Sequence, residues 1–590
     1  MRLIKLKIKN FRGIGEGVNG GGVEVEFDNN NIIFVCGENN AGKSTILEAY
    51  DMLVTASRQA KLTDFHGKDN TKAIVIEAWI QAENKDDIEH KALAKLWDDK
   101  DIAKVRKTWV SEDTKGVKET RDPVKGWGKG GAGGIDTLLQ NACPTPVWIR
   151  GSTSPEEILA LLQSLVQETI LKALSSEPVY LKAIEAVGAL EKEITSSKYS
   201  LQIQKNLNLA LAEVFPSLKF LLESESNANI AELFKKSTVV SIEQDGKPSM
   251  DFMTHGHGVR RQFIVSAFRG LARQLEEIKK GAKQRKAENF EFDATTVQSK
   301  SRILLIEEPE LYLHPEAIRC IRDLIYALGN DSEFQILAAT HAPIMVDLSK
   351  PHTTLVRAST NENKVVTLHQ VSHDLFDSNE RDCMKMLNYF NPHVCEAFFN
   401  DKVVLVEGDT EAVAIRALIA RMVSEGLANE SIHVVNCGTK NNIPFFQKVL
   451  THFKIPHWIL HDVDDKLDKN GDKNSAWTLN ETIWSAVTHS QQNQVKVTRF
   501  TFESEFESAN GYKYKSSLGK PYSAFLESQD WKLDDSNKKA IKYLRYILNI
   551  DDASKEPEHN QDYLGNSIRS KVVTLAYLVS TRRLSFDGRL

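Results

Sequence analysis

The stretch IIFVCGENNAGKSTILEAY, Ile32 to Tyr50, joins an apolar run to a helical pattern through a glycine-rich turn. Its central part, Gly37 to Ser44, fits G-x-x-x-x-G-K-[ST] between a predicted strand and a predicted helix, as this phosphate-binding loop requires. The stretch therefore predicts an α/β domain that binds ATP or GTP, with Mg²⁺ on the serine hydroxyl. The alternative is a strand-to-helix turn with an incidental lysine. The residues expected at the nucleotide are Gly37, Asn40, Gly42, Lys43, Ser44 and Thr45.

The composition describes a globular chain of several domains. Its 590 residues exceed what one hydrophobic core supports, and the net charge of −5 predicts no globally basic surface, so that nucleic acid would contact local patches. The six cysteines form no C-x-x-C pair, which argues for reduced thiols and against a zinc site. The N-terminus lacks an apolar signal region and no apolar run is long enough to cross a membrane, so a cytoplasmic location is expected.

The order of apolar runs predicts two α/β units with a helical segment inside the first. Strands near Val403, Ile432 and Trp458 indicate a small parallel sheet in the second unit. The basic, glycine-rich residues 101–134 are typical of a loop or a mobile insertion. The predicted segments are 1–153 (first part of the nucleotide-binding domain), 154–235 (helical insert), 236–378 (second part of that domain), 379–400 (linker) and 401–590 (second α/β unit).

A pair of glutamates follows a second apolar strand, in ILLIEEPELYLHP from Ile303. A phosphate-binding loop needs such an acidic partner on a neighbouring strand. We expect Glu307 to hold the Mg²⁺ shell and Glu308 to orient or deprotonate the attacking water. A purely structural role is disfavoured, because two adjacent glutamates at the end of a buried strand are costly unless a cation or hydrogen bonds compensate.

The run EEPELYLHP followed by AATHAP resembles the Walker B, D-loop and His-switch of ABC-type ATPases, the group with SMC-like and RecF-like proteins. The resemblance implies that His341 senses the γ-phosphate. It also implies that a signature helix opening at Gly256 and Gly258 caps ATP bound to a second copy, so that ATP joins two heads. His257 stands where the signature usually has serine. Gln81 is a candidate for the Q-loop glutamine, although a surface role fits it equally well.

Four carboxylates remain that the nucleotide site does not use. KVVLVEGDTE ends a predicted strand at Glu407 and starts a helix that carries Glu411. HWILHDVD ends another strand at Asp462, with Asp464 two residues later. Because the carboxyl ends of parallel strands meet at one edge of a sheet, we expect these side chains to lie together. Such a cluster repels strongly unless divalent metal ions bind it.

Strand-E-G-x-x-E with strand-D-x-D resembles the Toprim fold of topoisomerases, primases and related nucleases. VVNCGTKNNIPFFQKVL, between the two, adds a strand-Gly-x-Lys-x-Asn turn that is typical of one Toprim branch. An ABC ATPase followed by this Toprim variant resembles the OLD (overcoming lysogenization defect) family of nucleases over nearly the whole chain. The implied fold class is α/β: an ABC/SMC-like P-loop ATPase head with a helical dimerisation insert, followed by a Toprim domain with a small parallel sheet.

The resemblance implies phosphodiester cleavage with two metal ions. Glu407, Asp462 and Asp464 would hold one Mg²⁺, and Glu411 with a later acid would hold the second; Mn²⁺ or Ca²⁺ could substitute. That later acid comes from FTFESEFESA, which contains Glu503, Glu505 and Glu507, and Glu507 is preferred for the metal.

A lysine near the C-terminus completes the implied site. Lys571 stands where the family carries a lysine that neutralises the transition-state phosphate. The alternative is an ordinary lysine at the start of a helix.

The implied function is an ATP-regulated, metal-dependent DNA endonuclease or nickase with a role in phage defence. Expected partners are DNA, a second copy bound through the ATPase and helical region, and a defence partner such as a helicase, a reverse transcriptase or a retron nucleic acid. The rival hypothesis is a non-nucleolytic SMC/RecF-like ATPase with a degenerate Toprim site; a primase ranks lower, since no zinc module is found. Candidate DNA-contact patches, each also compatible with a solvated surface, are Lys104–Arg121, Lys279–Lys286 and Ser536–Ile547.

Overall fold

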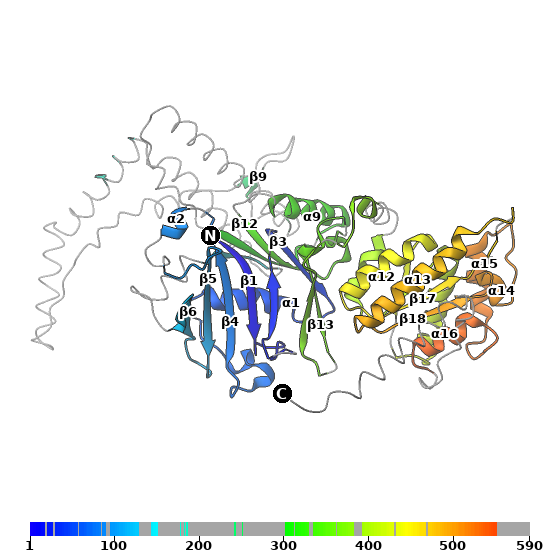
Figure 1. Cartoon of the computed structure of the whole chain (residues 1–590), viewed down its shortest axis with the longest axis horizontal. Coiled ribbons are helices and arrows are strands. Elements are labelled where there is room, and N and C mark those ends of the chain that lie inside the picture. The colour runs from blue at the N-terminus through cyan, green and yellow to red at the C-terminus, as the bar shows by residue number, and fades with distance from the viewer. Residues whose placement is uncertain are drawn as a thin grey trace, which may run out of the picture. The chain divides into compact units, whose positions relative to one another are not determined.

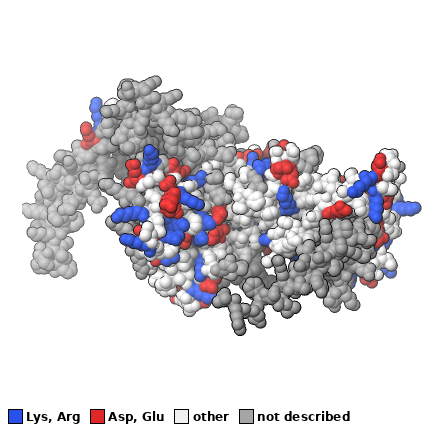
Figure 2. All heavy atoms as spheres, in the orientation of Figure 1, with Lys and Arg blue, Asp and Glu red and all other residues white. Residues whose placement is uncertain are grey.

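The computed structural model of the chain describes residues 1–128, 143–150 and 301–550 apart from short gaps, with isolated positions between 178 and 256 (Figure 1). The chain forms two compact units, Met1–Cys143 with Leu337–Leu590, and Pro144–Ile336. The visible face carries both basic and acidic side chains (Figure 2), in agreement with the small net charge. Nearly all of the predicted helical insert and all of Lys279–Lys286 lie outside the described residues, and the predicted domain boundaries stay predictions.

An antiparallel sheet begins the first unit. Its strand β4 buries every second residue of IVIEAWIQ, as a strand with one face on a core requires. Helix α1 (Lys43–Val54) contacts this sheet through β1 and β4. The strand order is β2-β1-β4-β5-β6-β7, with β1 (Arg2–Lys9), β2 (Val23–Glu26), β4 (Ile74–Gln81), β5 (Ile102–Trp109), β6 (Val117–Asp122) and β7 (Gly126–Gly128).

The prediction of a loop over residues 101–134 was wrong for the part that the structure describes, because β5, β6 and β7 lie there. In β5 the buried positions include Val105, Lys107 and Trp109, and the lysine disguised the alternation of a strand. The Lys107 ammonium donates hydrogen bonds to the carbonyls of Met52 (3.3 Å) and Thr55 (2.8 Å) at the end of α1. These carbonyls compensate the burial of the ammonium, although burial lowers the pKa of Lys107 to about 8.

The phosphate-binding loop follows β3 (Ile32–Gly37), a strand of six buried residues. Such a strand, buried on both faces, is typical of a parallel sheet. Parallel β13 (Leu355–Thr360) lies on one side of β3 and β12 (Phe334–Ala339) on the other, and β14 (Val366–Gln370) runs antiparallel to β13. In the compact unit Pro144–Ile336, β11 (Arg302–Glu307) pairs in parallel with β8 (Thr145–Ile149), and α9 (Pro315–Gly329) follows β11.

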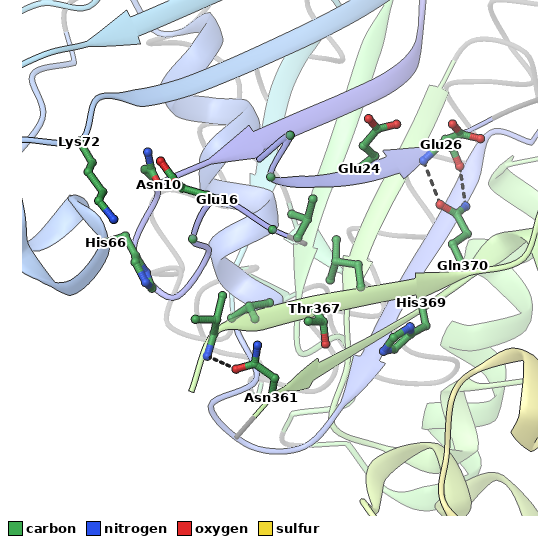
Figure 3. A pocket seen from close by; sticks show the side chains of 18 of the residues that line it. Asn10, Glu16, Glu24, Glu26, His66, Lys72, Asn361, Thr367, His369 and Gln370 are labelled. Carbon is green, nitrogen blue, oxygen red and sulfur yellow. Dashed lines mark hydrogen bonds between the residues drawn. The ribbon is translucent and has the colours of Figure 1, made fainter. Parts of the chain in front are cut away.

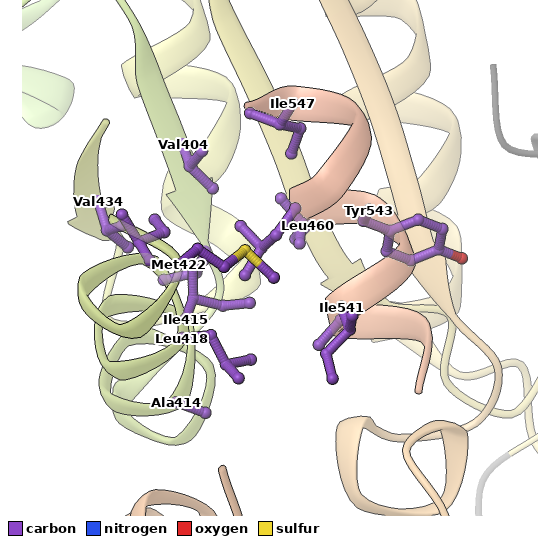
Figure 4. Packing of buried hydrophobic residues seen from close by; sticks show 14 of the residues in the cluster. Val404, Ala414, Ile415, Leu418, Met422, Val434, Leu460, Ile541, Tyr543 and Ile547 are labelled. Atoms are coloured by element: carbon purple, nitrogen blue, oxygen red, sulfur yellow. The ribbon is translucent and has the colours of Figure 1, made fainter. Parts of the chain in front are cut away.

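A parallel sheet of four strands forms the C-terminal domain, in the order β16-β15-β17-β18. This confirms the predicted small parallel sheet, to which β18 is an addition. Apolar residues of the strands, such as Val404 and Leu460, pack against Met422 of α11 and Tyr543 of α16 (Figure 4). The elements are β15 (Val403–Val406), α11 (Asp409–Ser424), β16 (His433–Asn436), α12 (Ile443–His452), β17 (His457–Asp462), α13 (Ser475–Gln492), β18 (Val497–Phe502), α14 (Phe506–Ala509), α15 (Lys520–Asp530) and α16 (Lys539–Ile547).

The remaining described elements are short. Among the described cysteines no disulfide is formed. The helices of the described residues include none with the length and apolar character of a membrane span. The short elements are α2 (Lys85–Glu89), β9 (Ser241–Ile242), β10 (Met250–Asp251) and 3-10 helices η1 (Leu62–Asp64), η2 (His66–Lys68), η5 (Pro343–Met345), η6 (His352–Thr354), η7 (Pro392–Phe399) and η8 (Lys440–Asn442).

We predict that Gly37→Ala destabilises the first unit and abolishes nucleotide binding. Gly37 has φ +135°, and a Cβ there would lie 2.0 Å from the Ala358 carbonyl oxygen of the neighbouring strand. Overpacking of this kind costs about 1–3 kcal/mol. Thermal unfolding and titration with a fluorescent ATP analogue measure the two effects. Gly128→Ala is the control, since a Cβ there meets no heavy atom within 4 Å; wild-type unfolding and nucleotide affinity in Gly37→Ala would contradict the prediction.

Candidate active site

The phosphate-binding loop presents backbone amides at the start of α1. Its N-cap, Gly42, has φ +83° and no side chain caps the helix, while Asn40 is also left-handed at φ +65°. The buried Lys43 Nζ donates hydrogen bonds to the carbonyls of Gly37 (2.8 Å) and Glu38 (2.5 Å). An uncapped helix start with a lysine folded over the loop is an arrangement that binds phosphate. Ser44 and Thr45, both half-buried, occupy the first turn of the helix.

The predicted acidic partner of this loop lies in the compact unit Pro144–Ile336. Glu307 ends β11, and Glu308 follows in a left-handed conformation with φ +48°. A left-handed glutamate is uncommon, and strained backbone of this kind clusters at functional sites. The backbone turns at once, because the Leu311 amide donates to the Glu308 carbonyl.

The other residues predicted at the nucleotide are more scattered. His341 is exposed just after β12. Gln81 ends β4 and lines a cavity of about 740 Å³ to which no residue of the phosphate-binding loop contributes. Gly256 is exposed, and Gly258 lies outside the described residues. The roles predicted for Gln81, His341 and the signature glycines therefore stay predictions.

A second cavity, of about 820 Å³, lies between β2 and β14 (Figure 3). The Gln370 side chain connects the two strands, because it accepts from the Glu26 amide (2.9 Å) and donates to the Glu26 carbonyl (2.6 Å). Val366 of its wall approaches Gly42, where a Cβ would lie only 2.8 Å away. None of the clustered carboxylates of the C-terminal domain lines this cavity, so it adjoins the phosphate-binding loop and not the metal centre.

The predicted carboxylates of the C-terminal domain meet at the carboxyl ends of β15 and β17. Glu407 follows β15, and its Oε2 accepts a hydrogen bond of 3.4 Å from the Asp462 amide at the end of β17. The buried Glu411 folds back from α11, where its Oε2 accepts from the Gly408 amide at 3.0 Å. This capping contact aims the Glu411 side chain at the same edge of the sheet.

The electrostatics of this edge are unfavourable without a cation. Burial, together with Glu411 and Glu407, raises the pKa of Asp462 to about 9. Burial also raises the pKa of Glu407 to about 7 and that of Glu411 above its ordinary value. The Oδ1 atom of Asp462 is buried and accepts no hydrogen bond. A buried acceptor among like-charged groups is a position that a divalent cation would stabilise.

Only one of the three competing glutamates after β18 belongs to this cluster. Glu503 and Glu505 are about half exposed, at 53% and 49%, and pair with Lys539 and Lys520. Glu507 is buried at the start of α14, and its charge raises the pKa of Glu411. The geometry therefore favours Glu507, the residue preferred from the sequence, as the fourth carboxylate.

Asp464 is held differently from the other acids. Asp464 lies two residues beyond the end of β17, in a left-handed backbone conformation with φ +60°. Its Oδ2 lies 2.5 Å from the Nζ of the buried Lys440. The same ammonium donates to the Asp462 carbonyl at 2.6 Å. Asn480 donates to the Val463 carbonyl at 2.8 Å and holds the loop from the other side.

Lys440 is a site residue to which the sequence assigned no role. Its sequence signal is the Gly-x-Lys turn after β16, which was assigned to the fold only. Lys571 lies outside the described residues. Asp465, which follows Asp464 directly, is exposed.

The carboxylates fit divalent metal ions by their chemistry, although their side chains would have to rotate. Among the described residues, no three His, Cys, Asp or Glu side chains are grouped closely enough to hold a metal ion as they stand. Glu411 is occupied by the Gly408 amide and Asp464 by Lys440. A site whose protein ligands are carboxylate oxygens suits Mg²⁺ and Mn²⁺, with water in the remaining positions.

Two protein families match different parts of the chain. The AAA ATPase domain matches residues 1–122 and 152–346, more than half of the chain. The TOPRIM domain of overcoming lysogenization defect protein-like sequences matches residues 398–464, which include Glu407, Glu411, Asp462 and Asp464. The two matches therefore cover the phosphate-binding loop and the carboxylate edge separately.

Three characterised proteins are similar in sequence. The Old nuclease of Escherichia phage P2 is 26% identical over 453 residues, which are 72% of each chain. The OLD nuclease of Thermus scotoductus is 32% identical over 162 residues, 27% of this chain and 30% of that protein. Endonuclease GajA of Bacillus cereus is 24% identical over 220 residues, 32% of each chain.

Among solved structures, the SmcHead bound to the C-winged helix domain of ScpA is similar to 63% of this chain and 98% of that chain, with 13% identity and a TM-score of 0.36. A score of this size is too low to support an argument. The family rests instead on the two domains in their order along the chain. This chain belongs to the AAA ATPase domain family over more than half of its length, and residues 398–464 match the TOPRIM domain of overcoming lysogenization defect protein-like sequences.

Proposed function

We propose that this chain is an ATP-binding and ATP-hydrolysing, divalent-metal-dependent DNA endonuclease or nickase whose Toprim domain cuts the phosphodiester bond. The curated relatives it resembles are nucleases by name, and it spans 72% of the length of the phage P2 protein. The role in phage defence, the cytoplasmic location and the pairing of two chains through the ATPase and helical region stay predictions.

One observation carries the proposal: buried carboxylates that follow three separate strand ends converge, and the Asp462 carboxylate among them forms no ion pair with a described cation. Glu407, Asp462 and Glu507 follow β15, β17 and β18, and Asp462 keeps a buried oxygen without a hydrogen bond. Burial of such charges is costly unless they are paired or coordinate a metal, and strongly perturbed carboxylates cluster at functional sites. The acidic edge therefore supports metal binding better than it supports a structural role.

The chemistry divides between the metal ions and the residues of the chain. Divalent ions held by Glu407, Glu411, Asp462, Asp464 and Glu507 would supply an activated water and stabilise the leaving 3′ oxygen. Lys440 holds the Asp462–Asp464 loop in place, and the Glu411 cap fixes its carboxylate at the strand edge. These contacts keep the acids near the strand edge, where a rotation of their side chains would bring them to a metal ion.

The rival function is an SMC/RecF-like ATPase with a degenerate Toprim site. A degenerate site would have lost the residues whose burial is costly, since nothing would then compensate them. Here the E-x-x-x-E and D-x-D acids are all present and the pKa of Asp462 is strongly raised. The rival is therefore disfavoured by the energetic cost of the intact cluster.

A buried arginine links the phosphate-binding loop to the Toprim domain. Arg357 of β13 lies beside Cys36 of β3, and its Nη2 donates to the Asn400 carbonyl (3.1 Å) and the Asp401 carboxylate (3.5 Å). Asp401 shares a hydrogen bond with Glu38 of the loop, and burial with this neighbouring carboxyl raises the pKa of Glu38 to about 7. Since β15 begins two residues after Asp401 and leads to Glu407, this junction is our candidate for regulation by ATP.

We predict that the two activities separate by mutation. Asp462→Ala should lower Mg²⁺- or Mn²⁺-dependent plasmid cleavage at least about 100-fold and leave ATP hydrolysis intact, because it removes a carboxylate from the metal edge only. Lys43→Ala should remove nucleotide binding. Plasmid nicking on gels and phosphate release measure the two. Cleavage by Asp462→Ala at the wild-type rate would refute the Toprim assignment.

We predict that Mn²⁺ stabilises the wild-type protein and that Asp462→Asn removes most of that effect. A ligand at about 100 times its Kd stabilises by about 2.7 kcal/mol. Thermal unfolding with and without Mn²⁺ measures the shift, and Asp534→Asn, an exposed acid of the same domain, is the control. An equal Mn²⁺ shift in Asp462→Asn would exclude this carboxylate as a ligand.

The metal-free protein should also lose stability as the pH rises. The native state keeps protons on Glu407 up to a pKa of about 7 and on Asp462 up to about 9, whereas the unfolded chain releases them near 4.5 and 3.8. Between these values the native state binds more protons, so the free energy of unfolding falls with increasing pH through this window. Unfolding in EDTA at pH 5, 7 and 9 tests the sign, and Asp462→Asn should flatten the dependence.

We predict that Asp401→Asn weakens the response of cleavage to ATP. Contacts of this kind carry about 0.5–2 kcal/mol of coupling between sites. Cleavage measured against ATP concentration should show a response reduced by at least half. ATP affinity is measured in parallel to separate weaker coupling from weaker binding, because Asp401 shares a hydrogen bond with Glu38 of the loop. Asp534→Asn again serves as the control. An unchanged ATP response would remove the junction from the regulatory route.

A further inference from the structure

Exposed aromatic side chains gather on one segment of the Toprim domain. Among the described Phe, Tyr and Trp residues, Tyr514, Tyr522 and Phe525 have the most solvent-exposed side chains, at 43%, 53% and 37%. Leu518 and Leu526, also exposed, lie in the same stretch. Residues 513–526, named here the aromatic–lysine segment, thus present an apolar face that the fold leaves uncovered.

Helix α15 explains which face is uncovered. The helix packs on α11, and its small residues Ser523, Ala524 and Ser528 are buried. Tyr522 and Phe525 lie on the opposite side, where their rings stack with centroids 6.4 Å apart and planes inclined by 13°. Packing against α11 therefore does not use the aromatic rings, although aromatic groups are the side chains with most to gain from burial.

The segment is also basic. Lys513, Lys515 and Lys520 lie within it, and the sequence has no acidic residue from 508 to 526 in a chain whose net charge is −5. Basic side chains stand out at the end of the domain that carries α14 and α15 (Figure 2). Lysines spaced between exposed aromatic rings match a partner that alternates flat apolar groups with negative charges.

One lysine joins this segment to the carboxylate edge. The Lys520 Nζ lies 3.2 Å from Glu507 Oε1 and 3.1 Å from Glu505 Oε2, and 5.3 Å from the centre of the Tyr514 ring. Glu507, like Glu411, is a buried carboxylate of the proposed metal site. The aromatic–lysine segment therefore adjoins the proposed cleavage site through Lys520.

We propose that the aromatic–lysine segment binds unpaired nucleotides of single-stranded DNA beside the cleavage site. Bases stack on Tyr522, Phe525 and Tyr514, and the lysines contact the phosphates between them. A second copy of the chain fits less well, because lysine is depleted in protein interfaces whereas it is interspersed here. The location relative to cleavage rests on the proposed function, but the binding itself does not.

The test measures DNA binding without cleavage. Fluorescence anisotropy in EDTA compares a labelled oligo(dT) strand with a labelled duplex of equal length. Tyr522→Ala with Phe525→Ala should weaken single-strand binding about tenfold or more, since each stacked base contributes substantially, and should change duplex binding much less. Tyr522→Phe should retain affinity because it keeps the ring. Leu427→Ala, an exposed apolar residue of the same domain, is the matched control.

The lysines give an independent readout. The slope of log affinity against log salt concentration is negative. For single strands, Lys513→Gln and Lys515→Gln should each reduce the magnitude of this slope by about 0.7. This change does not depend on stacking, so it separates phosphate contacts from ring contacts.

Several results would overturn the inference. Unchanged single-strand affinity in the double aromatic variant would do so, as would equal losses for single strand and duplex. If the double aromatic variant forms a smaller oligomer than the wild type in sedimentation but binds DNA equally well, the face would be assigned to a second copy of the chain instead. If the wild type binds single strands through this segment but never cuts DNA with Mg²⁺ or Mn²⁺, the proposed function fails and the binding site remains.

Discussion

Repulsion among buried carboxylates is the constraint that organises the Toprim domain. A parallel sheet brings the carboxyl ends of β15, β17 and β18 to one edge, and an acid follows each of them. Three contacts in the surrounding structure reduce the repulsion: the Lys440 ammonium pairs with Asp464, the Gly408 amide donates to Glu411, and Lys520 pairs with Glu507. What these contacts leave uncompensated, above all at Asp462, is the place for a cation.

A charge balance around Arg357 also connects the ATPase domain to the strand that leads to this edge. β3 and β13 are parallel neighbours, so the loop after β3 lies near Arg357, and the arginine reaches Asn400 and Asp401 ahead of β15. The charges of Glu38 and Asp401 are therefore balanced by the buried Arg357, although Asp401 itself is exposed. A phosphate group arriving at the loop would disturb that balance, which gives nucleotide binding a short physical route toward Glu407.

Much of the fold and site was predictable because it rests on local patterns. The strand–loop–helix around Lys43 and the strands that end at Glu407 and Asp462 all lie as predicted, since apolar periodicity marks strands and helices directly. Strand β5 was missed because buried Lys107 interrupts its alternation, and that lysine is stabilised by carbonyls from α1, more than fifty residues away in the chain. A contact across such a distance leaves no periodic signal in the sequence.

The sequence by itself determined the chemistry that is present: a phosphate-binding loop, acids at strand ends and their order along the chain. Tertiary structure alone decided which of Glu503, Glu505 and Glu507 reaches the cluster, because Glu503 and Glu505 precede the short helix α14 and stay about half exposed, whereas Glu507 is buried in its first turn. It also decided that Lys440 holds the Asp462–Asp464 loop and that Tyr522 and Phe525 stay exposed beside Lys520. Each of these depends on how separate elements pack, and packing is a property of the folded chain rather than of any one segment.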